Sequence, residues 1–191
     1  SMPDTDTEPR VLIVDDEREV ADAYALRLRD VCAVTTAYGG REALAAVDDR
    51  VVDVVLLDRH MPDVSGDDVL ATLRDREFAG RVVMVTAVDP DVNVVDLPFD
   101  DYLCKPIDRA DVRSVVDQQR QILAYETLGE YYRVKSTELV LSAQTPSGEP
   151  TGSGEDEAIR EKADRLERRV RRLLEDETVL TEFEAVDRTL A

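Results

Sequence analysis

Residues 51–66 read VVDVVLLDRHMPDVSG, and in this stretch an apolar run ends abruptly at the acid Asp58. Residues 51–57 are mostly β-branched and apolar, which is typical of a strand buried on both faces of a parallel sheet. A carboxylate at the carboxyl end of such a strand projects into the crevice where open α/β sheets bind ligands. Pro62 and Gly66 break regular structure, so a loop is expected after Asp58. Taken alone, Asp58 would be interpreted only as an acid that ends a strand.

Four other segments have a similar short apolar pattern. They are residues 10–14, 32–37, 82–86 and 101–104. Between several of them the spacing of apolar residues is helical, and Ser65 is of a residue type that caps helices. Strands that alternate with helices of this length predict the α/β class, with a doubly wound, five-stranded parallel sheet covered by helices on both faces.

The carboxyl ends of five parallel strands meet at one edge of the sheet, where this sequence places polar side chains. They belong to Asp15, Asp16, Asp58, Thr86 and Lys105. Three neighbouring carboxylates repel one another, which raises the pKa of at least one of them, and Mg²⁺ relieves this repulsion because it prefers oxygen ligands. Lys105 can pair with a carboxylate or a phosphoryl oxygen, and Thr86 can donate a hydrogen bond. Such a set is typical of phosphoryl transfer, in which an Asp can itself accept the phosphoryl group.

Taken in order, these residues closely resemble the receiver domain of two-component response regulators. The resemblance rests on the acidic pair Asp15-Asp16, the DxxMPxxxG segment from Asp58 to Gly66, Thr86-Ala87, and Tyr102 three places before Lys105-Pro106. It covers about residues 10–118 and implies a flavodoxin-like fold. It also implies that a histidine kinase or a small phosphodonor phosphorylates Asp58, and that Lys105 and Thr86 assist at the site.

The resemblance further implies roles for the residues around Asp58. Mg²⁺ would bind Asp15, Asp16, Asp58 and the backbone carbonyl of His60. Thr86 and Tyr102 would form a switch pair that moves together when the phosphoryl group is present. The side chain of His60 would tune the lifetime of the phosphoryl group without binding the metal.

Simpler structural interpretations exist for three of these residues. Asp15 could serve only the dipole of the next helix, Thr86 could be an ordinary strand residue, and Tyr102 could be a half-buried tyrosine on an edge strand. We favour the functional interpretation of all three. One departure from the family pattern is Pro98, which stands where receivers usually carry a turn glycine, and proline cannot adopt the left-handed conformation. The helix before Pro98 is therefore expected to be short or irregular.

Helical spacing continues in the C-terminal part of the chain. Residues 108–143 contain no proline, so the last receiver helix is expected to continue outward as one long helix, and residues 145–156 form a loop by composition. A second helix is predicted from a seven-residue repeat of apolar side chains at Ile159, Leu166, Leu173 and Leu180. We expect the two helices to form an antiparallel hairpin. The predicted parts are a disordered tail at 1–9, a receiver domain at 10–118 and a helical hairpin at 119–191.

This C-terminal part resembles the HalX domain that follows receivers in halophilic archaea. The resemblance rests on AYETLGEYYRVKSTEL at 124–139 and on EFEAV at 182–186. The composition agrees, because 43 acidic against 24 basic residues give a net charge of −19, and the acidic excess is spread along the chain. Such a surface suits a cytoplasm with concentrated salt, and a halophilic archaeal source is expected. A protein that binds basic partners would instead carry clustered acids.

The output of the chain is less determined by its sequence. Its one basic cluster consists of Arg165, Arg168, Arg169, Arg171 and Arg172. Acidic residues lie four positions from most of these arginines, which favours a solvated helix face over nucleic-acid binding, and the overall charge opposes DNA. We therefore expect a homodimer that forms through the hairpin or the receiver face and regulates transcription. A regulator that binds DNA directly through the C-terminal domain is the alternative.

A second alternative is a phosphohydrolase of the haloacid dehalogenase type, which also uses an Asp nucleophile at a strand end. That family needs a second acid two residues later, where this chain has His60. We therefore do not expect a dedicated enzyme. The sequence has no apolar run long enough to span a membrane and no apolar signal core, so a cytoplasmic location is expected. Cys32 and Cys104 are expected to be buried free thiols.

Overall fold

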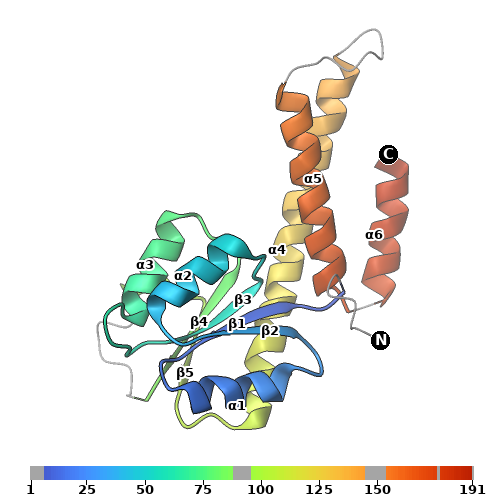
Figure 1. The fold of residues 1–191 in the computed structure, drawn as a ribbon. Coiled ribbons are helices and arrows are strands. Elements are labelled where there is room, and N and C mark those ends of the chain that lie inside the picture. Colours follow the sequence, from blue (N-terminus) through green and yellow to red (C-terminus); the bar gives the residue numbers. More distant parts are fainter. Residues whose placement is uncertain (1–6, 88–95, 145–153, 176, 191) are drawn as a thin grey trace. The chain divides into compact units, whose positions relative to one another are not determined.

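The computed structural model describes residues 7–87, 96–144, 154–175 and 177–190 (Figure 1). The chain divides into two compact units, which we call the sheet unit (Glu8–Arg120) and the helical unit (Gln121–Ala191). Helix α4 (Arg109–Ala143) contributes residues to both of them. None of the helices in the described ranges is both long enough and apolar enough to cross a membrane.

The sheet unit contains a five-stranded sheet in which all neighbouring strands are parallel. The strands are β1 (Arg10–Val14), β2 (Ala33–Ala37), β3 (Val54–Asp58), β4 (Arg81–Thr86) and β5 (Asp101–Cys104). Their order in space is β2-β1-β3-β4-β5. After β2, which lies on one side of β1, the remaining strands are added in sequence on the other side of β1. This arrangement confirms the predicted doubly wound α/β fold.

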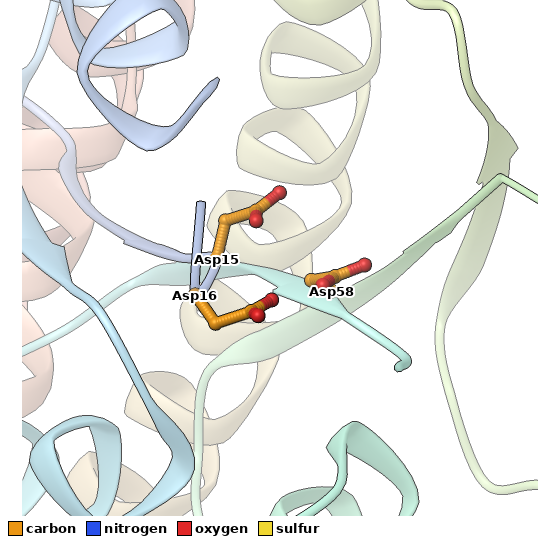
Figure 2. A group of neighbouring side chains, drawn as sticks. All are labelled: Asp15, Asp16 and Asp58. Carbon is orange, nitrogen blue, oxygen red and sulfur yellow. The ribbon is translucent and has the colours of Figure 1, made fainter. Parts of the chain in front are cut away.

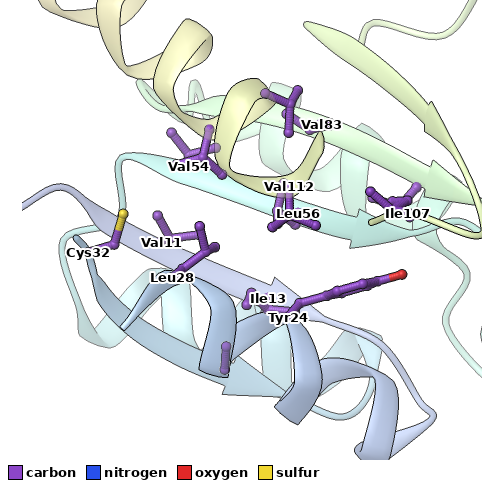
Figure 3. Packing of buried hydrophobic residues seen from close by; sticks show 14 of the residues in the cluster. Val11, Ile13, Tyr24, Leu28, Cys32, Val54, Leu56, Val83, Ile107 and Val112 are labelled. Atoms are coloured by element: carbon purple, nitrogen blue, oxygen red, sulfur yellow. The ribbon is translucent and has the colours of Figure 1, made fainter. Parts of the chain in front are cut away.

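Helices cover both faces of the sheet, which explains why the central strands are apolar at every position except their ends. The helices of this unit are α1 (Arg18–Leu28), α2 (Gly40–Asp49), α3 (Gly66–Asp75) and the first part of α4. Ile13 and Leu56 point to the face with α1 and α4, where they pack with Tyr24 and Val112 (Figure 3). The alternate strand residues, such as Leu57, pack on the opposite face with residues of α2 and α3. Both faces of β3 are therefore buried.

Several local predictions can be compared directly with the structure. Ser65 caps α3 as predicted, because its side chain accepts a hydrogen bond from the amide of Asp68, whose carboxylate accepts one from the amide of Ser65. Two predictions were wrong: Val51 precedes β3 and is 49% exposed, and Cys104 at the end of edge strand β5 is exposed. The helix expected before Pro98 falls largely on residues 88–95, which lie outside the described residues.

The helical unit contains the rest of α4, α5 (Gly154–Leu173) and α6 (Glu177–Leu190). The helices α4 and α5 are antiparallel, as the hairpin prediction requires, and Lys162 of α5 pairs with Glu130 of α4 at 3.1 Å. The second helix was expected to be continuous through Leu180, but α5 ends at Leu173 and Leu180 lies on α6. The break lets Phe183 of α6 pack on Tyr131 of α4, with their ring centroids 5.1 Å apart.

Candidate functional site

The first two acids of the site come directly after β1. Asp15 is only 2% exposed, and its Oδ1 accepts a hydrogen bond of 2.9 Å from the amide of Glu17, which fixes the carboxylate. The amide of Asp15 also donates to the carbonyl of Ala37, so the chain remains aligned with β2 beyond the end of the strand. Asp16 is more accessible than Asp15. One acid is therefore held in the protein interior while its neighbour is partly exposed.

The third acid, Asp58, is the last residue of β3 and is 6% exposed. Because β1 and β3 are parallel neighbours, Asp58 lies beside the acids that follow β1 (Figure 2). One carboxylate oxygen from each of Asp15, Asp16 and Asp58 lies within 4.8 Å of the others. The structure thus brings together the three acids that the sequence placed at this edge, in a cluster that could hold a metal ion.

Lys105 follows β5 and supplies a positive charge to the same cluster. Its Nζ lies 2.8 Å from Oδ2 of Asp15 and 3.4 Å from Oδ1 of Asp58. Burial alone would lower the pKa of Lys105, but the hydrogen bond to Asp15 and the charge of Asp58 raise the pKa above its ordinary value. The lysine is therefore charged at neutral pH and bridges two of the three carboxylates.

One carboxyl of the cluster has a perturbed pKa. Burial raises the pKa of Asp58 from 3.8 to about 6, and the charge of Asp15 acts in the same direction. Lys105 opposes this shift without cancelling it. Concentrated negative charge is thus only partly neutralised by the protein itself, which is the condition under which a hard divalent cation binds favourably.

The two residues predicted to form a switch pair are in contact. Thr86 ends β4 and is fully buried, and Tyr102 lies on the neighbouring strand β5. The hydroxyl of Tyr102 makes side-chain hydrogen bonds with Thr86 and with Arg59. Burial raises the pKa of Tyr102, so the phenol is protonated at neutral pH and can donate a hydrogen bond. Thr86 therefore connects the acidic edge of the sheet to a tyrosine on the edge strand.

Comparison with known families agrees with this geometry. Residues 11–117 match the response regulator receiver domain family. The chain belongs to this family.

Two curated relatives carry names that refer to transcription. A "Putative transcriptional regulator" of Haloferax volcanii is 46% identical over 136 residues, which are 70% of this chain and 23% of the relative. The "Transcriptional regulatory protein CutR" of Streptomyces coelicolor is 43% identical over 101 residues, which are 51% of this chain and 46% of the relative. The chain thus spans less than half the length of either relative.

Solved receiver structures have the same fold. The signal receiver domain of a "putative Luxo repressor protein" from Vibrio parahaemolyticus is 28% identical, with a TM-score of 0.61 over 64% of this chain and 98% of that one. The response regulator TrrA from Thermotoga maritima, solved in complex with Mg²⁺ and BeF, is 27% identical, with a TM-score of 0.53 over 58% of this chain and 98% of that one.

The loop of the receiver that follows Asp58 is held close to the site by Gly66. A Cβ atom at this position would lie 2.2 Å from the carbonyl oxygen of Asp58, so a side chain cannot be accommodated. The amide of Gly66 donates a 2.8 Å hydrogen bond to the carbonyl of Arg59. His60 lies in this loop with an exposed side chain. The sequence motif indicated Gly66, but the steric reason for it became visible only in the structure.

Two residues of the receiver site were not identified from the sequence. Tyr24 of α1 is close enough for its pKa to be affected by Lys105 and Asp15, after burial, which is the main cause of its raised pKa. A cavity of about 540 Å³ beside Lys105 is lined partly by Tyr24. Arg59 contacts both Asp67 and Tyr102. No sequence pattern marks either residue, apart from the position of Arg59 directly after Asp58.

Proposed function

We propose that this chain is a two-component response regulator that accepts a phosphoryl group on Asp58 in a Mg²⁺-dependent reaction. The observation that carries the proposal is the cluster of Asp15, Asp16 and Asp58, which Lys105 bridges at the carboxyl edge of a receiver sheet. A histidine kinase is the proposed phosphodonor, and a small acyl phosphate would serve the same chemistry.

The residues present fit a magnesium ion. The carboxylates of Asp15, Asp16 and Asp58 would hold it together with the backbone carbonyl of His60, since Mg²⁺ prefers oxygen ligands. When bound, the ion supplies positive charge that neutralises the carboxylates and the phosphoryl oxygens. The partial neutralisation by Lys105, which leaves the pKa of Asp58 at about 6, supports this assignment.

The proposed reaction needs Asp58 as the nucleophile. A carboxylate oxygen of Asp58 forms a bond to phosphorus while the phosphorus–nitrogen bond of the donor phosphohistidine breaks. The departing imidazole keeps the electron pair of that bond and takes up a proton. Lys105, which already lies 3.4 Å from Asp58, is positioned to pair with an oxygen of the transferred group. The buried hydroxyl of Thr86 would donate a hydrogen bond to another phosphoryl oxygen.

Thr86 and Tyr102 are the proposed switch pair. Their hydrogen bond joins the phosphorylation site to edge strand β5, so a change at Thr86 would be transmitted to Tyr102. We propose that the signal passes to the C-terminal helices and changes self-association, and that the final output is transcription. The names of the Haloferax and Streptomyces relatives support a role in transcription.

The helical unit is proposed to be a HalX-type domain and the source a halophilic archaeon. The relative from Haloferax volcanii supports both, because its similarity extends over 136 residues, more than residues 11–117 contain. The residues 1–9, 10–118 and 119–191 remain our proposed tail, receiver domain and C-terminal domain. A cytoplasmic location remains a proposal as well.

Neither alternative function gains support from a structural observation. In the basic cluster, Arg171 is paired with Glu167 of α5 and Glu184 of α6, which does not favour DNA binding. The expectation of a solvated helix face was wrong for Arg172, which is only 6% exposed. The phosphohydrolase alternative needs a second acid where this chain has His60, whose side chain is exposed.

The proposal is tested by incubation with acetyl phosphate and Mg²⁺, followed by intact mass measurement. The wild-type chain should gain one phosphoryl group, and Asp58→Asn should gain none. Asp63→Asn is the matched control, because Asp63 lies in the adjacent loop and pairs with Arg41 at the surface. A gain by Asp58→Asn equal to that of the wild type would contradict the proposal.

A further inference from the structure

Arg59 has a fixed backbone although it lies beyond the end of β3. Its amide donates a 2.9 Å hydrogen bond to the carbonyl of Val85, which continues the pairing of β3 with β4 by one residue. Its carbonyl accepts the hydrogen bond from Gly66. The Arg59 side chain is only 13% exposed. The side chain of Arg59 is thus attached to a backbone position fixed by hydrogen bonds and is largely buried.

The guanidinium of Arg59 is anchored by the first turn of α3. Its Nε lies 3.1 Å from Oδ1 of Asp67, and its Nη2 lies 3.3 Å from Oδ2 of the same carboxylate. Two parallel hydrogen bonds between a guanidinium and a carboxylate fix the plane of the guanidinium as well as its position. Asp67 therefore orients the guanidinium of Arg59.

The anchored guanidinium reaches Tyr102. A guanidinium has five N–H donors, so the contact with Asp67 leaves donors for the hydroxyl of Tyr102. The same hydroxyl is hydrogen-bonded to Thr86, and the ring of Phe99 lies 5.6 Å from the Tyr102 ring between centroids. Tyr102 is thus restrained at its hydroxyl by two side chains and at its ring by a third.

We propose that Arg59 is a positioning residue that holds Tyr102 on Thr86 before any phosphoryl group is present. The contacts Asp67–Arg59–Tyr102–Thr86 form a continuous path from the loop after Asp58 to the switch pair. A ligand shifts a conformational equilibrium only by the difference between its affinities for the two states. Because Arg59 already favours the state in which Tyr102 contacts Thr86, the phosphoryl group has to shift that equilibrium by a smaller amount. The signalling consequence rests on the proposed function, whereas the position of Tyr102 does not.

Fluorine NMR of the full chain labelled with fluorotyrosine tests this inference. Tyr102→Phe identifies the Tyr102 resonance by its loss. In the wild-type chain, Mg²⁺ and beryllofluoride should move this resonance by less than they move it in Arg59→Ala, because Arg59 already favours the contact of Tyr102 with Thr86. In Arg59→Ala it should lie at a different position without beryllofluoride and move toward the wild-type position when beryllofluoride is added. Arg59→Lys, which keeps the charge but loses the two-point contact, should give an intermediate position.

Two further variants make the test specific. Arg41→Ala removes another arginine–aspartate pair near the site, that of Arg41 with Asp63, and should leave the Tyr102 resonance unchanged. Asp67→Asn removes the anchor of Arg59 and should reproduce the direction of the Arg59→Ala shift. It also serves as the second variant if Arg59→Ala does not fold.

The inference is overturned if the Tyr102 resonance of both Arg59→Ala and Asp67→Asn coincides with that of the wild type without beryllofluoride. Failure of the proposed function has a different signature. In that case the wild-type chain would gain no phosphoryl group on Asp58, while the spectra recorded without beryllofluoride would still decide the role of Arg59.

Discussion

The sheet unit and the helical unit of this chain differ in the polar groups that they bury. The sheet unit buries two carboxylates of one cluster, Asp15 and Asp58, beside the hydroxyl of Thr86. The core of the helical unit contains aliphatic and aromatic side chains such as Tyr131 and Phe183, and the polar side chains that its described residues bury, Thr127 and Arg172, include no carboxylate. Buried carboxylates that repel one another do not stabilise a fold, so their presence in one unit indicates a chemical task, whereas the other unit is organised by packing.

The largest effect that we expect concerns packing in the helical unit. Phe183→Ala removes a ring that is 1% exposed and packs on Tyr131, and should lower the free energy of unfolding of that unit by about 3–5 kcal/mol. Urea unfolding followed by circular dichroism measures this change. Phosphoryl uptake on Asp58 should persist, and its loss in a variant with a folded sheet unit would show that the two units are not chemically separate.

The second effect compares one glycine from each unit. Gly66→Ala should destabilise the sheet unit by about 2–3 kcal/mol, because the added Cβ would lie 2.2 Å from the backbone oxygen of Asp58. Gly129→Ala, at an exposed position in α4 with nothing within 4 Å of the added Cβ, should stabilise the chain by up to about 1 kcal/mol through helix propensity. Equal effects in urea unfolding would contradict the structural difference between the two sites.

The smallest effect concerns the charge on Asp58. Well below pH 3.8 this carboxyl is protonated in both the folded and the unfolded chain, and it carries no penalty. Between pH 3.8 and about 6, Asp58 is ionised in the unfolded chain but still protonated in the folded chain, so the free energy of unfolding falls as the pH rises. Above about pH 6, Asp58 is ionised in both states, and the loss of stability stays constant. Asp58→Asn should therefore stabilise the chain by about 1 kcal/mol at neutral pH. This is less than the free energy equivalent to the full pKa shift, because solvent screens part of the interaction.

The measurement for this prediction is thermal unfolding of Asp58→Asn and of the wild type at several pH values without divalent cations. The difference between the two should vanish well below pH 3.8, and added Mg²⁺ should reduce it at neutral pH by stabilising the wild type. A stabilisation that does not change with pH would show that Asp58 is not a strained ionised carboxyl.

Much of the sheet unit could be predicted from the sequence because parallel sheets impose strong patterns. The run before Asp58 had to be a buried strand, and parallel strands bring their carboxyl ends to one edge, so Asp15, Asp58 and Lys105 could be placed together without coordinates. The errors lie at the edges, where the patterns are weak. Val51 has the composition of a strand but precedes the first hydrogen-bonded pair of β3.

Other features depend on tertiary packing and left no signal in the sequence. The seven-residue repeat through Leu180 predicted one continuous helix. It does not show that α5 ends at Leu173 or that Phe183, on the next helix, packs into the core of the helical unit. The link between Arg59 and Tyr102 joins residues distant in sequence that contact only because β3, β4 and β5 are neighbours. The roles assigned to the site residues remain predictions.

The most direct test of the central claim is to locate the phosphoryl group. The chain is incubated with acetyl phosphate in Mg²⁺ or in excess EDTA, the acyl phosphate is reduced with borohydride, and the modified residue is identified by peptide mass spectrometry. The account predicts modification at Asp58 in Mg²⁺ and little or none in EDTA. Modification at another residue, or equal modification of Asp58 without a divalent cation, would contradict it.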